Sequence, residues 1–430
     1  MGASTRVLLI VENLTVPFDR RVWMEAVSLT EAGYQVSIIC PTGGEYARPY
    51  EQIEGITIYR YRSPRPTRGH LSYFWEFFYC WAMTALLSLK VLRREGFDII
   101  HACNPPDTFF LLGMIYKPFG KRFVYDQHDL CPEVYLARFK RKPNLLYQGL
   151  LALERLTYST ADLVLAPNES YREMAIRRGH VPPDRVMVVR SAPDPRRFRP
   201  VASDPALKRG RRFLVVYLGV MAPQDGVDLL IDVIDYLVHQ RGRRDVAFAL
   251  IGSGDSYYDL RKLASERGLD DYVTFTGRIP DEEVEKYISS SDVCVSPDPK
   301  NELNDHSTMN KVLEYMALAK PCVAFDLKET RYSAGPSALY ATPNDAADFG
   351  ERILELLADE PRRREMGRLG LERLREHLGW AHSRKSLLRA YARLAGLRAR
   401  SSAITAAVPL HPAAGAAPAA GAPPATGGWG

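Results

Sequence analysis

Cysteine is scarce in this chain, and its spacing excludes two common uses. Six cysteines are scattered singly among the 430 residues, without a Cys-x-x-Cys spacing: Cys40, Cys80, Cys103, Cys131, Cys294 and Cys322. This distribution argues against a disulfide framework and against a structural zinc site. The first apolar run, 7–11, is also too short for a signal peptide. We therefore expect reduced thiols and a cytoplasmic protein.

The sequence also lacks an Asp-x-Asp motif, and it has no block of basic residues interleaved with aromatics. We therefore expect no metal site and no nucleic-acid partner. The formal net charge of +6 is modest for this length. Such an excess suits phosphate-bearing ligands or an anionic membrane surface, although a basic surface without a partner would have the same composition.

Apolar content of 46% and charged content of 25% are typical of a globular protein, and the length favours two domains. Two series of short apolar runs alternate with helical patterns, which predicts two parallel sheets covered on both faces. The predicted strands are 6–11, 35–40, 56–60, 99–102, 123–126, 163–167 and 185–189, then 213–218, 247–251, 273–275, 293–295 and 322–325. We expect domains at 1–195 and 196–378, a terminal helix at 379–398 and a disordered Ala/Pro/Gly tail at 399–430.

An aromatic stretch, 71–89, interrupts the first series and has nearly the length of a membrane span. It contains Glu76, and predicted strands of one domain lie on both sides of it, so a span would divide that sheet. A transmembrane helix is therefore the least favoured interpretation. The alternatives are a core helix and an arginine-rimmed aromatic surface that touches a bilayer or a lipid-linked substrate.

The polar stretch 304–317 is the strongest candidate for a ligand site. Its good N-cap residue types, followed by apolar residues at helical spacing, predict a helix that begins near Thr308. The N-terminus of such a helix stabilises a phosphate group, and Lys311 would add a full positive charge. Ser307, Lys311 and Glu314 would share one stripe that suits a hydroxyl or phosphate oxygen, a diphosphate and a ribose. The alternative is a solvated helix face with an ordinary cap.

Ligands of open α/β sheets bind beyond the carboxyl ends of the strands. In the second series these ends carry glycines, which let a ligand approach the backbone closely. In the first series they carry polar side chains, and His128 stands there among carboxylates, either in a functional role or bonded to a neighbour to fix the loop. The strand-end residues are Gly219, Gly252, Gly254, Gly277 and Arg278 in the second series, and Asn13, Asn104, Asp107 and 126–133 in the first.

These residues together resemble the retaining glycosyltransferases of family 4, over roughly 6–395. The matching motifs are His128 at a strand end, Tyr217-Leu218-Gly219, Ile251-Gly252-Ser253-Gly254, Phe275-Thr276-Gly277-Arg278, Glu314-Tyr315-Met316-Ala317 and a closing amphipathic helix. The resemblance implies an α/β protein of the GT-B fold, with two Rossmann-like doubly wound domains facing a central cleft. The first domain would bind the acceptor and the second the nucleotide sugar, and the helix near 380–395 would cross back to the first domain.

The resemblance also implies residue roles. Glu314 matches the second Glu of the family's E-x7-E element, which holds the ribose, and Lys311 matches a lysine that contacts the diphosphate. His128 is similar to the histidine that faces the donor sugar, while Arg278 with Ile279 resembles the segment whose backbone meets the base.

Two departures from the family pattern stand out. His306 occupies the position of the first Glu, so Asp305 is the candidate substitute, and Val220 and Asp225 stand where the family commonly has Arg and Lys. Lys311, the helix N-terminus and Arg20 or Arg21 must then balance the phosphate charge. The stretch resembles a subgroup with the form Asn-Asp-x-Ser-Thr-Met-Asn-Lys.

The predicted reaction is retaining, metal-independent and cofactor-free transfer of a sugar from a nucleoside-diphosphate sugar to a hydroxyl acceptor. The acceptor would be a lipid-linked glycan intermediate of a surface polysaccharide, which would place the protein at the inner membrane face, or a specialised-metabolite aglycone. A sugar-nucleotide 2-epimerase-like isomerase and a catalytically silent partner subunit are the alternatives. The predicted residues are His128, Lys311 and Asp305 for catalysis; Gly219, Gly252, Gly254, Arg278, Ile279, His306, Ser307, Thr308, Met309, Lys311 and Glu314 for the donor; and Asn13, Asp19, Arg20, Arg21, Asn104, Asp107, Asp129 and Glu133 on the acceptor side.

Overall fold

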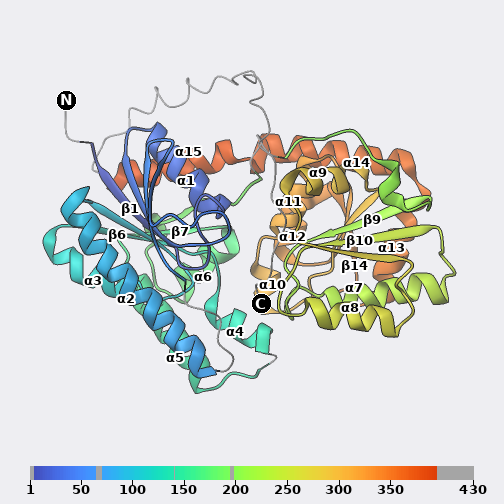
Figure 1. The fold of residues 1–430 in the computed structure, drawn as a ribbon, viewed down its shortest axis with the longest axis horizontal. Helices are drawn as coiled ribbons and strands as arrows, with labels where there is room; N and C mark the ends of the chain where they lie inside the picture. The colour runs from blue at the N-terminus through green and yellow to red at the C-terminus, as the bar shows by residue number, and fades with distance from the viewer. Residues whose placement is uncertain (1–3, 64–69, 140, 194–197, 395–430) are drawn as a thin grey trace.

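Two sheets organise the computed structural model, which describes residues 4–63, 70–139, 141–193 and 198–394 (Figure 1). The first sheet has the order β3-β4-β2-β1-β5-β6-β7-β8, and the second has the order β11-β10-β9-β12-β13-β14. All pairs are parallel except the antiparallel pair of β3 and β4. The predicted doubly wound α/β fold is therefore confirmed in both halves of the chain, while the predicted tail lies outside the described residues.

The strands follow the apolar runs. In the first domain they are β1 (Arg6–Ile10), β2 (Gln35–Pro41), β3 (Tyr50–Ile53), β4 (Ile56–Tyr61), β5 (Ile99–Cys103), β6 (Arg122–Asp126), β7 (Leu163–Ala166) and β8 (Val186–Val188). In the second they are β9 (Phe213–Leu218), β10 (Val246–Ile251), β11 (Val273–Gly277), β12 (Val293–Ser296), β13 (Cys322–Phe325) and β14 (Ala338–Ala341). The edge strands β3 and β14 were not predicted, because β3 mixes polar and apolar residues and β14 is a run of only four residues.

Helices cover both faces of each sheet. The first domain has α1 (Arg20–Glu31), α2 (His70–Arg94), α3 (Phe110–Tyr116), α4 (Cys131–Phe139), α5 (Leu145–Thr160) and α6 (Glu169–Arg177), with short helices η1 (Lys117–Phe119) and η2 (Pro183–Arg185). The second has η3 (Pro205–Lys208), α7 (Val227–Asp235), η4 (Tyr236–Gln240), α8 (Tyr257–Glu266), α9 (Asp281–Ser290), α10 (Glu302–His306), α11 (Asn310–Ala317), α12 (Lys328–Ala334), η5 (Gly335–Ser337), α13 (Ala346–Ala358), α14 (Glu360–Arg373) and η6 (Leu374–Leu378). The last helix is α15 (Trp380–Leu394).

Alternation along β1 shows how the first domain builds two cores. Leu8 and Ile10 pack into one apolar cluster, which α2, α3 and α5 cover. Val7 and Leu9 point to the opposite face and join a cluster covered by α1 and α15. Successive strand residues face opposite sides, so a run that is apolar throughout is buried on both.

The crossing helix α15 leaves the second domain and extends along the first (Figure 1). Leu387, Ala390 and Tyr391 are buried in the first domain's core beside α1. Trp380 Nε1 donates a 3.0 Å hydrogen bond to Ser28 Oγ on α1. The two domains therefore share one structural helix.

The aromatic stretch forms α2, and its side chains are described from Trp75 onward. Within the described part of the chain, no helix combines the length and the apolar character that crossing a membrane requires. All six cysteines are unpaired; five are buried and Cys131 is half-buried.

Candidate functional site

The helix of the polar stretch begins at Asn310, two residues later than predicted. A short helix, α10, precedes it and is capped by Asn301, whose side chain accepts from the backbone N–H of Asn304. Ser307 lies between the two helices and donates to Leu303 O at 2.7 Å. The predicted stripe of three residues is therefore wrong at its first member: Lys311 and Glu314 lie on α11, and Ser307 does not.

Lys311 is not a free cation. Its Nζ lies 2.6 Å from Asp298 Oδ1, and the two side chains are only 9% and 2% exposed. Burial opposes the charge, but Asp298 and the nearby Asp225 outweigh it and raise the pKa of Lys311. Burial also raises the pKa of Asp225 to about 6. The expectation that Lys311 offers an unshared charge to a phosphate is corrected, although an ammonium keeps N–H groups beyond the one that Asp298 takes.

Glu314 faces the other domain. Arg20, at the start of α1, reaches Glu314 Oε1 at 3.1 Å and also pairs with Asp281 of α9. Burial raises the pKa of Glu314 to about 7, and Arg20 opposes that rise. Arg20 was predicted on the acceptor side and across the cleft from the phosphate; it lies instead on the carboxylate that is predicted to hold the ribose.

A neighbouring contact also joins the domains at the segment predicted to meet the base. The Arg278 guanidinium lies 4.0 Å from the centre of the Phe18 ring, and burial, followed by the charge of Arg20, lowers the pKa of Arg278. Ile279 packs against the core of the second domain.

The strand-end glycines pack against protein. A Cβ on Gly252 would lie 1.8 Å from Gly219 O, and one on Gly254 would lie 2.5 Å from Met221 O. A Cβ on Gly219 would come within 3.0 Å of Lys311 Cε. These glycines therefore let the strand-end loops close on one another and on Lys311, which differs from the predicted close approach of a ligand.

The loop 306–308 is tied to the first domain. Asn168 Nδ2 donates to His306 O at 2.8 Å and to Thr308 Oγ1 at 3.0 Å, and Arg190 donates to the same Thr308 oxygen at 3.1 Å. Tyr171 OH lies 3.0 Å from Ser307 Oγ. These partners could not be predicted from the sequence, because they lie more than a hundred positions away.

The side chains of Asp305 and His306 form hydrogen bonds to different helices. Asp305 Oδ1 accepts from the backbone N–H of Lys328 at 2.9 Å, at the start of α12. His306 Nδ1 lies 2.7 Å from Glu302 O within α10. One oxygen of Asp305 is therefore taken, and the role predicted for it as a substitute carboxylate falls to Oδ2.

His128 lies at the end of β6, where the sequence placed it. Its Nε2 donates to Asp126 Oδ2 at 2.6 Å, and its backbone N–H donates to Asn104 Oδ1 at 2.6 Å. Asn104 also accepts from the backbone N–H of Asp129 and donates to Asp107. Both alternatives for His128 survive in part, because it is fixed by a carboxylate and keeps 17% of its side chain exposed.

Several predicted acceptor-side residues are used inside the first domain. Asp107 is buried and accepts from Tyr125 OH, and Glu133 pairs with Arg178. Asp19 caps α1 by accepting from the backbone N–H of Val22. Each of these side chains has at least one partner inside the first domain, although Asp107 Oδ2 is buried without a hydrogen-bond partner; Asn13 is exposed.

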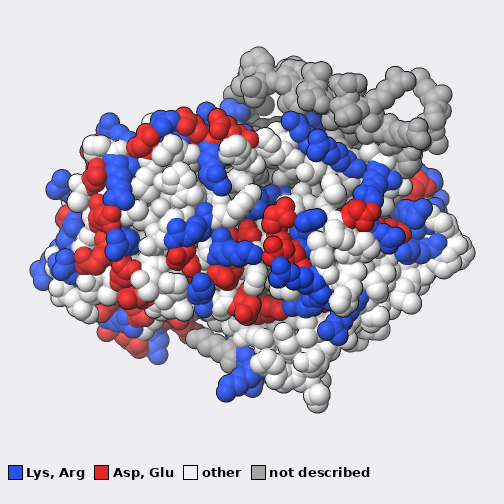
Figure 2. Space-filling view, turned by 180° about the vertical axis from the view of Figure 1, so that it is seen from behind, with Lys and Arg blue, Asp and Glu red and all other residues white. Residues whose placement is uncertain are grey.

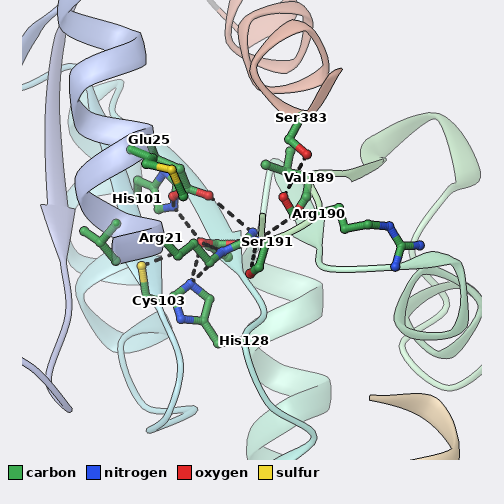
Figure 3. Close-up of polar contacts among 12 residues, drawn as sticks. Arg21, Glu25, His101, Cys103, His128, Val189, Arg190, Ser191 and Ser383 are labelled. Atoms are coloured by element: carbon green, nitrogen blue, oxygen red, sulfur yellow. Dashed lines mark hydrogen bonds and ion pairs between the residues drawn. The ribbon is translucent and has the colours of Figure 1, made fainter. Parts of the chain in front are cut away.

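Arg21 is also internal (Figure 3). Its Nη2 lies 2.6 Å from Asp126 Oδ1, and its Nη1 donates to Val189 O at 2.7 Å. Arg21 is 8% exposed. It neutralises Asp126 within the first domain and does not reach across the cleft as a phosphate ligand, which corrects that expectation.

His101, Cys103 and Asp126 place one ligand atom each within 4.8 Å of one another, so we tested this group as a metal site. The Arg21 guanidinium already occupies Asp126, and burial raises the pKa of the Cys103 thiol well above its ordinary value. A second cation would meet Arg21 and a protonated thiol. The group therefore does not fit a metal ion.

Comparison with known proteins places this geometry in a family. The model of the "Glycosyl transferase 4-like domain" matches residues 19–192, and that of "Glycosyl transferases group 1" matches residues 212–359. The chain is 30% identical over 304 residues to the alpha-D-kanosaminyltransferase of Streptomyces kanamyceticus, covering 66% of this chain and 75% of that protein. It is 25% identical over 208 residues to the phosphatidylinositol N-acetylglucosaminyltransferase GPI3 subunit of Saccharomyces cerevisiae (strain YJM789), covering 47% of this chain and 44% of that protein's length.

Solved structures support the fold. A sucrose-phosphate synthase from Thermosynechococcus elongatus superposes with a TM-score of 0.73 at 19% identity, covering 91% of this chain and 99% of that one. Anabaena HepE in complex with UDP and glucose superposes with a TM-score of 0.69 at 16% identity, covering 90% and 100%. With two parallel-sheet domains, matching family models and these relatives, the chain belongs to the glycosyltransferases of the GT-B fold.

Proposed function

We propose that this chain is a retaining, metal-independent glycosyltransferase of family 4 that uses a nucleoside-diphosphate sugar. The observation that carries the proposal is the pairing of Arg20 with Glu314 across the two domains, next to buried Lys311 on the same helix. A carboxylate with a pKa of about 7 can accept hydrogen bonds from a ribose, and an ammonium one turn earlier can meet a diphosphate.

Leaving-group stabilisation is the proposed chemistry. The backbone N–H groups at the start of α11 and the Lys311 ammonium are fixed in place before the donor arrives, so they stabilise charge as it develops on the diphosphate. Asp298 holds Lys311 in that position. His128 faces the donor sugar from the first domain, and an acceptor hydroxyl attacks on the side the diphosphate leaves, with a phosphate oxygen taking its proton.

A donor screen tests the nucleotide part of the proposal. Thermal unfolding of the native protein with UDP, GDP, dTDP and ADP sugars should show one nucleotide class that raises the Tm, because a ligand that binds only the folded state stabilises it. The same screen on Glu314→Gln should give a smaller rise. An absence of any rise with every nucleotide class overturns the proposal.

For the acceptor, we propose a lipid-linked glycan intermediate of surface-polysaccharide assembly. Helices α2, α3, η1 and α5 of the first domain carry large exposed apolar side chains: Trp75, Phe78, Leu86, Met114, Ile115, Phe119, Leu145 and Leu156. Exposed cations stand on α2, on α5 or shortly before α5: Lys90, Arg93, Arg94, Arg141, Lys142 and Arg155. Aromatics with neighbouring cations suit the interface of an anionic bilayer, so we propose peripheral attachment at the inner membrane face.

Seen from behind, acidic and basic side chains are interleaved over the second domain, whereas the lower part of the first domain carries few charges (Figure 2). Flotation with anionic vesicles should carry the native protein upward and leave Trp75→Ser/Phe78→Ser behind. Tyr258→Ser is the matched control, because Tyr258 is 78% exposed on α8 of the other domain. If the native protein never floats, or if the Tyr258 variant is lost equally, the membrane proposal fails.

A specialised-metabolite aglycone is the second candidate acceptor, since the relative from Streptomyces kanamyceticus is named a kanosaminyltransferase. Both relatives above are named as transferases or transferase subunits, which favours transfer over the epimerase alternative. Turnover of donor without any acceptor would reverse that preference. Binding without turnover would favour a silent partner subunit.

A further inference from the structure

A buried polar cluster links the crossing helix α15 to the cleft. Tyr391 OH of α15 lies 2.6 Å from His101 Nδ1 on β5, and both residues are fully buried. His101 Nε2 in turn lies 3.4 Å from Asp126 Oδ2 and 3.5 Å from Glu25 Oε2. Asp126 is the carboxylate that holds His128 (Figure 3).

The position of each proton follows from burial. Burial raises the pKa of Tyr391 well above its ordinary value, so the phenol stays neutral and donates its hydrogen. Burial also lowers the pKa of His101, so its ring is neutral and carries one N–H. Tyr391 therefore donates to Nδ1, and the ring proton of His101 is placed on Nε2, where it faces the two carboxylates.

Asp126 Oδ2 is the junction of the cluster. It accepts from His128 Nε2 at 2.6 Å and from Arg21 Nε at 3.1 Å, and it faces the His101 N–H. Arg21 Nε also lies 3.2 Å from His128 Nε2. The shorter contact, between His128 Nε2 and Asp126 Oδ2, requires a hydrogen on Nε2, so this nitrogen cannot also accept from Arg21. The Arg21 Nε–H therefore donates to Asp126. Asp126 is thus hydrogen-bonded by His128 and Arg21, and His101 Nε2 lies 3.4 Å from it without completing a hydrogen bond, so that contact is electrostatic.

We propose that Tyr391 is a positioning residue for His128. It acts through His101 and Asp126, so that the packing of α15 against the first domain fixes the orientation of the His128 ring. This inference rests on the glycosyl transfer proposed above, in which His128 faces the donor sugar. The charged and titratable groups around Asp126 are Asp19, Arg21 and Glu25 of the α1 segment, His101 and Cys103 of β5, His128 after β6, and Tyr391 of α15.

Tyr391→Phe removes one oxygen and keeps the ring that packs edge-on against Tyr34 at 5.5 Å. Loss of one buried hydrogen bond should lower kcat by about 10-fold, while the donor KM changes by less than about twofold. The control is Leu387→Ala, which truncates a fully buried side chain of the same helix. When both variants are assayed well below their Tm values, Leu387→Ala should keep kcat near the native level, although its Tm falls further than that of Tyr391→Phe. An equal loss of kcat in both variants would assign Tyr391 a purely structural role.

A double-mutant cycle tests the route. If Tyr391 acts through His128, the tyrosine substitution should have no further effect on kcat in a His128→Ala background. If the fold-losses in kcat of the two single variants multiply in the double variant, the inference is overturned.

Ring-nitrogen NMR of histidine-labelled protein gives a readout that needs no activity. The His101 signals should show an Nε2–H ring in the native protein, and Tyr391→Phe should move the His128 signals as well. His128 signals that stay in place overturn the inference. Inactivity of the native protein with every donor, accompanied by this spectral coupling, would count against the proposed function and leave the positioning contact established.

Discussion

Replacing Lys311 with methionine removes a positive charge that is already paired with a carboxylate inside the second domain before a ligand arrives. The ammonium lies 2.6 Å from Asp298, and both side chains are nearly buried. Removing one partner of a buried pair leaves an uncompensated charge and costs about 3–5 kcal/mol. The pKa of the nearby Asp225, about 6, already includes a lowering by Lys311, so it rises in the variant and lets Asp225 take up a proton. The loss therefore comes mainly from Asp298, and because that side chain is only 2% exposed we expect a value near the upper end, about 5 kcal/mol.

Calorimetric unfolding at pH 7 measures this loss. For a domain of this size, about 5 kcal/mol lowers the Tm of its transition by roughly 10–20 °C. Lys311→Met/Asp298→Asn should recover most of that Tm, because the carboxylate in direct contact with Lys311 is removed together with the ammonium. The double variant should nevertheless fail to transfer sugar. A single variant whose Tm stays within a few degrees of native, or a double variant that transfers at the native rate, would refute the reasoning.

Three further predictions concern buried or half-buried charges. Glu314 has a pKa of about 7, so nucleotide affinity should rise as the pH increases from 6 to 8, and Glu314→Gln should flatten this profile in calorimetric titrations. Arg20 opposes the rise in that pKa, so Arg20→Met should move the same profile to higher pH; an unmoved profile would contradict the ion pair. Glu12 is buried at the end of β1, and desolvation, followed by the charge of Glu76, raises its pKa to about 9. Because the pKa of Glu12 is higher in the folded than in the unfolded protein, its contribution to stability is complete at a pH below the unfolded pKa. That contribution is lost as the pH rises toward 9, and about 3 kcal/mol of it is lost by pH 7. Glu12→Gln should therefore raise the Tm at pH 8 more than at pH 5, and an equal shift at both would contradict it.

Much of the fold was predictable from periodicity. The run at β9 is apolar at every position and the run at β1 is apolar after Arg6, because helices cover both faces of their sheets, so their boundaries could be found within a residue. The edge strand β3 was missed because it is half exposed and mixes polar and apolar residues. The short helix α10 was missed because its cap, Asn301, precedes the stretch that looked like a single loop.

The candidate site was predictable in position and less so in pairing. Strand ends and the helix that follows one of them drew attention to His128, Lys311 and Glu314, since parallel strands present their carboxyl ends on one edge; their roles stay predictions. The partner of Lys311, Asp298, is itself a strand-end residue, but nothing in the sequence distinguishes a lysine held by a buried carboxylate from a free one. Arg20 and Arg21 are adjacent in sequence, yet one crosses to the second domain and the other is buried within the first. Helix rotation and packing decide that difference.

The fate of the anomeric centre tests the central proposal most directly. Native protein, the nucleotide sugar selected by the thermal screen and a lipid-linked hydroxyl acceptor are incubated together, and the product is examined by NMR at the transferred sugar's anomeric carbon. The account predicts one nucleoside diphosphate released per sugar linked, with the donor's anomeric configuration kept. An inverted linkage, or donor consumed without any linkage to an acceptor, would contradict it.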